Sequence, residues 1–77
     1  MRRIPVESSG RVRDWNSLSC LLFGKECGCR SEFEHEALQV TEPMVIEVRH
    51  AASVDPEVMD ALESIQQKSA MIYVIRG

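Results

Sequence analysis

The fold of this chain is decided by the stretch Met44-Val45-Ile46-Glu47-Val48-Arg49-His50. Met44, Ile46 and Val48 alternate with polar residues, and a period of two places one set in a core and the other on the opposite face. Val45 is the apolar exception on the polar face, so we expect that face to be partly covered. The stretch therefore predicts a strand over 44–49.

The residues after this strand predict a helix over 56–68. Asp55 can cap its first turn, and Pro56 suits the first helical position, where its missing N–H costs nothing. One apolar stripe runs along the helix and consists of Val58, Met59, Leu62 and Ile65. A stripe this narrow packs against one surface, most simply the sheet face beside it.

Residues 70–76 predict a second strand that is apolar on both faces. Met71, Tyr73 and Ile75 form one face, and Ile72 and Val74 form the other. A strand of this kind is usually central and covered twice. The connection through the helix is long enough to join parallel neighbours, and an antiparallel arrangement with another strand in between is equally open.

The first 30 residues predict one short strand and one helix. Ile4 and Val6 fit a brief edge strand, since Pro5 lacks the N–H that an inner strand must donate. Asp14 fits a helix cap, and Gly24 fits a left-handed stop, for a helix over 14–23. Trp15 is expected to anchor this helix in the core.

Residues 31–40 are ambiguous between helix and strand. Glutamates at every second position give a strand pattern, whereas Ser31 with Glu34 forms a capping box and the composition favours helix. We favour a strand, because residues 40–44 then form a hairpin turn into the strand at Met44. That strand would present Glu32, Glu34 and Glu36 on one exposed face.

The fold class expected from these elements is α+β in one small domain over residues 1–77. A sheet of three or four strands would include 44–49 and 70–75, with helices over 14–23 and 56–68. The strand-helix-strand unit over 43–76 organises it. A chain of this length buries only about 60% of its unfolded surface, so metal, oligomerisation or a partner would help to stabilise it.

Charge and composition narrow the function classes. The net charge is −3, with +3 over residues 1–30 and −6 over residues 31–77. A negative protein with four aromatic residues is a poor candidate for nucleic-acid binding. No apolar segment resembles a signal peptide or a membrane span, and three cysteines fit reduced thiols. We therefore expect a cytoplasmic protein that binds neither nucleic acid nor membrane.

Thiolates and an imidazole are suitable zinc ligands, and this chain carries four candidates at Cys20, Cys27, Cys29 and His35. Their spacing departs from that of two Cys-x-x-Cys hairpins, so we expect no cofactor and keep a zinc-stabilised domain as the alternative. Thiol redox chemistry at Cys27 and Cys29 is a further alternative. No phosphate-binding glycine loop or catalytic dyad motif is present, so we expect a protein that is not an enzyme.

The remaining hypothesis is a regulatory protein that acts by protein–protein contact. One helix can cover only one face of the second strand, and an exposed apolar patch often marks an interface. We expect a homodimer or another protein on the sheet near Tyr73, with Val45 and Arg76 at the rim. Glu32, Glu34 and Glu36 would offer an acidic face to a basic partner. The small size and scattered polar residues have the general look of an accessory protein encoded by a phage or mobile element.

Overall fold

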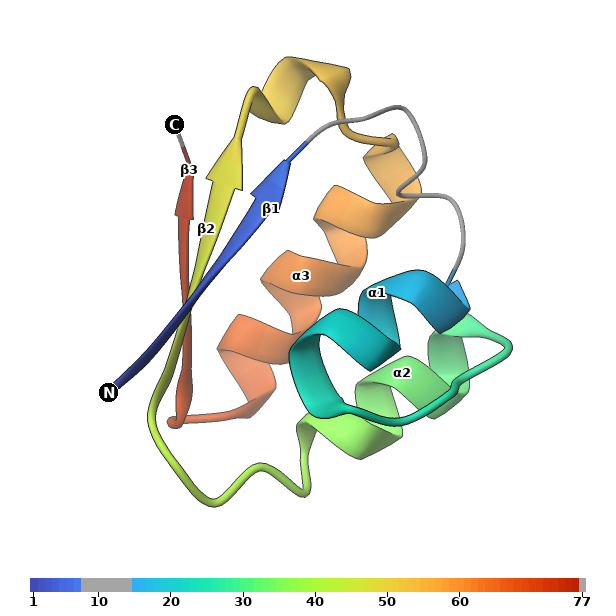
Figure 1. Ribbon diagram of the computed structural model, residues 1–77, viewed down its shortest axis with the longest axis vertical. Helices are drawn as coiled ribbons and strands as arrows, with labels where there is room; N and C mark the ends of the chain where they lie inside the picture. The colour runs from blue at the N-terminus through green and yellow to red at the C-terminus, as the bar shows by residue number, and fades with distance from the viewer. Residues whose placement is uncertain (8–14, 77) are drawn as a thin grey trace.

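The computed structural model describes residues 1–7 and 15–76. Their elements follow in the order β1 (Arg2–Glu7), α1 (Trp15–Phe23), α2 (Arg30–Ala37), β2 (Met44–Arg49), the short 3-10 helix η1 (Ala51–Ser53), α3 (Pro56–Lys68) and β3 (Ile72–Arg76). Figure 1 shows these elements as two layers, with the sheet on one side and the helices on the other.

The described part of the chain forms a sheet of three parallel strands in the order β1-β2-β3, so β2 is the central strand. One cross-strand row joins Ile4, Ile46 and Val74, and the next row joins Pro5, Glu47 and Ile75. β1 lies at an edge, as Pro5 predicts. β3 lies at the other edge, so the expectation of a central second strand is wrong: its two apolar faces do not reflect two strand neighbours.

All three α-helices of the described residues lie on one side of the sheet (Figure 1). The strand order explains this arrangement. Each connection moves one strand further in the same direction, and the preference for right-handed crossovers then places both sets of helices on the same side. The first helix therefore does not cover the second face of the sheet.

The core lies between the sheet and the helices. We call the side of the sheet that faces the helices the covered face; its side chains are Ile4, Val6, Met44, Ile46, Val48, Ile72 and Val74. Leu62 and Ile65 of α3 pack against them, as do Leu22 of α1 and Phe33 of α2. Trp15 is half-buried against this core, with its ring centroid 5.4 Å from that of Phe33.

Two of the helices begin or end as their local sequence predicts. Asp55 caps α3 by accepting a hydrogen bond from the Glu57 N–H at 2.9 Å, and Pro56 occupies the first helical position. Gly24 follows α1 with a φ of 71°, the left-handed conformation that glycine adopts without a steric penalty. The predicted cap at Asp14 lies outside the described residues.

The strand expected within 31–40 is wrong, because Arg30–Ala37 form helix α2. Phe33 and Ala37 are both fully buried, and their spacing of four residues places them on one helical face. Glu32 secures the helix start, since its Oε1 accepts a hydrogen bond from the Gly28 N–H at 2.9 Å. Burial of a single apolar stripe and this hydrogen bond to the preceding loop outweigh the alternation of glutamates.

The predicted mixture of helices and strands in one small domain is confirmed, with three α-helices among the described residues instead of two. The described residues contain no fourth strand. The helices that the structure describes are all too short or too polar to cross a lipid bilayer.

Candidate functional site

The side of the sheet opposite the helices is the candidate site. Alternation along each strand places there the residues between the buried ones, and we call this the open face: Arg3, Pro5, Val45, Glu47, Arg49, Met71, Tyr73 and Ile75. Figure 1 shows no described element over this side of the sheet. A parallel sheet normally has both faces covered, so an open face of this kind is unusual.

The open face is apolar along β3. Tyr73 is 61% exposed, Met71 40% and Ile75 38%. Val45 on β2 lies in register between Arg3 and Tyr73 and is only 7% exposed, although it belongs to the same face. The accessible apolar surface of this face is therefore a stripe along the edge strand.

An ion pair bounds the apolar stripe on the side toward β1. Arg3 Nη2 lies 2.6 Å from Glu47 Oε2, and the two side chains belong to β1 and β2. An exposed pair of this kind contributes at most about 1 kcal/mol to folding. On the open face, the pair neutralises the charges of its two side chains, and the apolar stripe beside it carries no charge.

Arg76 does not lie at the rim of the open face. It belongs to the same alternation as Ile72 and Val74, which point toward the helices. Its guanidinium pairs with Glu63 of α3. Of the three sheet residues expected to bind a partner, Tyr73 is well exposed, Val45 lies beneath its neighbours, and Arg76 ties β3 to α3.

The three glutamates predicted to form one acidic face do not share a face, because α2 is a helix: Glu32 and Glu36 line the same hollow, whereas Glu34 faces α3. The Glu32 carboxylate faces the start of its own helix, where the Cys29 thiol lies 3.5 Å away. Glu36 pairs with Lys25 at 3.1 Å. The expectation of one acidic strand face is therefore wrong, since side chains two apart on a helix lie on different sides.

Glu34 joins α2 to α3. Its carboxylate lies 3.5 Å from Arg30 and 3.7 Å from Lys68. A hydrogen bond from the Ser64 hydroxyl, aided by Lys68 and Arg30, holds the pKa of Glu34 below its ordinary value against the opposing effect of burial. Arg30 also pairs with Asp60 at 2.8 Å, and this carboxylate raises the pKa of Arg30. The network fastens two helices together.

The four candidate zinc ligands are dispersed. Cys27 is buried, whereas Cys20 and Cys29 are exposed. His35 lies on α2 with its Nε2 3.2 Å from Gln39 Nε2. Within residues 1–7 and 15–76, no three histidine, cysteine, aspartate or glutamate side chains are grouped so that they could hold a metal ion. The donor set that zinc prefers is present in the sequence but is not assembled.

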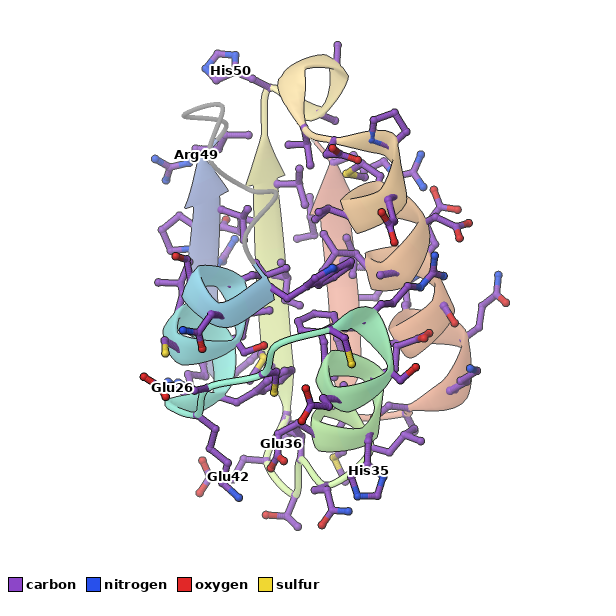
Figure 2. All side chains as sticks on the ribbon, turned by 90° about the vertical axis from the view of Figure 1, so that its right-hand side faces the viewer. Glu26, His35, Glu36, Glu42, Arg49 and His50 are labelled. Carbon is purple, nitrogen blue, oxygen red and sulfur yellow. The ribbon has the colours of Figure 1, made fainter. Side chains whose placement is uncertain are left out.

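Two open hollows lie among the helices and the amino ends of the strands. One, of about 220 Å³, is lined by Arg2, Leu22, Phe23, Glu36, Gln39, Val40, Thr41, Glu42 and Met44. The other, of about 290 Å³, is lined by Glu26, Cys27, Ser31, Glu32, His35 and Glu36. Figure 2 shows Glu26, Glu36 and Glu42 at this end of the molecule, and their carboxylates would repel an anionic ligand.

The carboxyl ends of the strands lie at the opposite end, where parallel sheets commonly bind ligands. His50 follows β2 there with a φ of 56°, and its exposed side chain points away from the sheet (Figure 2). The nearby start of α3 is occupied by the Asp55 carboxylate, which takes the place that a bound anion would use. The start of α3 is therefore not arranged as a phosphate site.

Sequence reasoning identified Tyr73 and missed most of the open face. Ile75 was assigned to the same strand face as Tyr73, but Arg3, Pro5 and Glu47 were not connected with it. The missing information was strand order, which places β1 beside β2 and so puts Arg3 in the row with Tyr73. The available signal was the second apolar face of residues 70–76, which has no helix to face.

Comparisons with protein families, with curated proteins and with solved structures find no match to this chain. Its function is therefore argued from the open face alone.

Proposed function

We propose that this protein acts by binding another protein chain through the open face of its sheet, and that this contact, rather than catalysis, is its role. The observation that supports the proposal is the apolar stripe of Met71, Tyr73 and Ile75 on a parallel sheet face that no described element covers. Apolar surface in water is costly, and its burial stabilises a complex by roughly 25 cal/mol per Å² before the costs of association.

The composition of the stripe supports a protein partner. Tyr73 has a large rigid ring for contact and a hydroxyl that tolerates water, which is why tyrosine is enriched at interfaces. Met71 adapts to an irregular surface. The Arg3–Glu47 pair beside the stripe supplies the polar rim that interfaces commonly have.

The other sites predicted from the sequence, the three glutamates and the four candidate zinc ligands, have less support than the open face. Glu34 and Glu36 pair with basic groups of this chain, and Glu32 accepts a hydrogen bond from the Gly28 N–H, so a basic partner would compete with these contacts. A zinc-stabilised domain would have to draw together Cys20, Cys27, Cys29 and His35 from separate positions. A cytoplasmic setting and an origin in a phage or mobile element stay predictions.

Affinity capture with matched variants tests the proposal. The baits are the wild type, Tyr73→Arg and Leu21→Arg, the last of which alters an exposed apolar residue on α1, in the helical layer. We expect at least one protein, either a different chain or a second, differently tagged copy of this one, to bind the wild type and Leu21→Arg and to be lost with Tyr73→Arg. Its binding is then measured with both purified proteins.

Circular dichroism of each bait serves as the folding control. Because Tyr73 is exposed, Tyr73→Arg should keep the wild-type spectrum. If no protein binds in a Tyr73-dependent manner, or if Leu21→Arg abolishes binding as fully as Tyr73→Arg, the open face is not the binding site.

A further inference from the structure

We propose that Gln66 of α3 guards the outer edge of β3, so that no further strand pairs with the sheet there and the protein does not assemble through this strand. This role concerns the edge of β3 and not the open face, so it goes beyond the proposed function and does not depend on it. Three observations carry it: the direction of the peptide groups in β3, the contact of Gln66 with one of them, and the composition of the strand.

The peptide groups of β3 alternate between its two sides. The Met44 N–H donates to the Met71 carbonyl oxygen at 2.7 Å, so the peptide groups of odd-numbered residues in this strand face β2. The N–H of Val74, the middle residue of β3, therefore points to the outer side. The described part of the chain places no strand on that side. A further strand would need the Val74 N–H as its central donor.

The side chain of Gln66 occupies this donor. Its Oε1 accepts the Val74 N–H at 2.5 Å in a partly buried contact. A short connection brings the two residues together: α3 ends at Lys68, and the Ser69 hydroxyl oxygen accepts the Met71 N–H just before β3 begins. A strand added at this edge would have to displace Gln66 and break a hydrogen bond that is already formed. Proteins protect sheet edges from pairing by covering them in this way.

The composition of β3 makes such protection necessary. Residues 70–75 read Ala-Met-Ile-Tyr-Val-Ile, without a charge, a proline or a glycine. Uncharged segments of this length, rich in β-branched and aromatic residues, stack into extended sheets when they are exposed at an edge. At the other edge of the sheet, β1 contains Pro5 and begins and ends with the charged residues Arg2 and Glu7. These residues discourage pairing without help from a helix.

Gln66 also differs from the other polar contact between α3 and β3. Arg76 pairs with Glu63, and this ion pair fastens the end of β3 to the helix through two side chains. Gln66 instead takes up a backbone donor in the middle of the strand. Fastening alone does not require that donor, whereas closing the edge does.

Hydrogen exchange at the Val74 amide tests the contact. Gln66→Ala should speed this exchange about tenfold or more, because the N–H then faces water without local opening. Gln66→Glu keeps an acceptor oxygen and should keep most of the protection. Gln67→Ala is the matched control, since it changes the same residue type at the next, exposed position of α3. Equal exchange of Val74 in Gln66→Ala and the wild type would overturn the proposal.

Assembly of the concentrated protein tests the guard itself. We expect Gln66→Ala to form β-rich assemblies, detected by thioflavin T fluorescence and sedimentation velocity, under conditions in which the wild type and Gln67→Ala form none. Combining Gln66→Ala with Ile75→Lys adds a charge to the edge strand and should restore the wild-type behaviour. If Gln66→Ala assembles no more than the wild type, or if the double variant assembles as readily as Gln66→Ala, Gln66 does not guard β3.

Loss of stability also promotes assembly, so Asp55→Ala serves as a second control. This variant removes the cap at the opposite end of the same helix and leaves the edge of β3 intact. It is compared with Gln66→Ala at urea concentrations that give the two proteins the same folded fraction. We expect only Gln66→Ala to assemble. Equal assembly of the two variants would assign the effect to unfolding and overturn the proposal.

Discussion

The two faces of the sheet are formed by the same strands but have different partners. The row Ile4, Ile46 and Val74 lies beneath the helices, whereas the row one residue further along, Pro5, Glu47 and Ile75, has no described helix above it. On β1 and β2 the second row consists of Pro5 and Glu47, which are residue types commonly exposed to water. On β3 it remains apolar, so the difference between the faces shows where folding has left apolar surface exposed.

The largest expected effect breaks the covered face. Ile46→Ala removes a fully buried side chain from the middle of the central strand, and it should lower the free energy of unfolding by about 2–5 kcal/mol. Ile75→Ala makes the same chemical change on the open face and should cost well under about 1 kcal/mol for the isolated chain. Urea unfolding followed by circular dichroism measures both values.

This pair also tests the assignment of faces. Equal losses of stability in Ile46→Ala and Ile75→Ala would mean that the open face is covered within a single chain. Measurement at low protein concentration keeps association from stabilising the wild type by mass action.

A smaller effect is expected at the start of α3, the helix that covers β3. Asp55→Ala removes the side chain that accepts the Glu57 N–H, and it should lower the free energy of unfolding by about 1 kcal/mol. Asp55→Asn keeps a capping oxygen and should recover most of the loss. Thermal unfolding compares the three proteins, and equal losses in both variants would show that the cap contributes little.

The smallest expected effect depends on pH and concerns Glu34. Its pKa is lowered in the folded protein, so the contribution of the carboxylate to stability is present above the ordinary value of 4.5 and is lost as the pH falls through the lower folded value. Glu34→Gln should therefore lose less than about 1 kcal/mol at neutral pH and show a flatter decline in acid. Urea unfolding at several pH values measures both slopes.

Equal acid sensitivity of Glu34→Gln and the wild type would contradict this account. If Glu34→Gln is as sensitive to acid below pH 4.5 as the wild type, the contacts with Ser64, Lys68 and Arg30 do not stabilise the folded state through this carboxylate.

Local sequence patterns predicted those features whose conformation depends on a few neighbouring residues. α3 and its Asp55 cap, the left-handed Gly24 after α1, and the edge position of Pro5 all follow from neighbours in the sequence. Each depends on a backbone preference or a hydrogen bond that a few residues decide. Residues 31–40 satisfied two patterns at once, and burial of Phe33 in the tertiary structure decided for helix.

Strand order and its consequences were beyond local patterns. The sequence showed that residues 70–76 are apolar on both faces, with Tyr73 on one and Val74 on the other. A central strand has this pattern, and so does an edge strand with an exposed apolar face. The same limit applies to Gln66, whose contact with Val74 depends on where α3 lies relative to β3. Tyr73 could be named as a candidate from sequence, whereas the extent of the open face could not.

The central claim is that the open face is the binding surface, and an NMR chemical-shift map on association tests it most directly. Backbone amide shifts would be recorded on dilution from high concentration and, if a different protein is captured, on its addition. We predict changes concentrated at Val45, Met71, Tyr73 and Ile75, with α1 and α2 unchanged. Changes concentrated on the helical layer, with β3 unaffected, would contradict the claim.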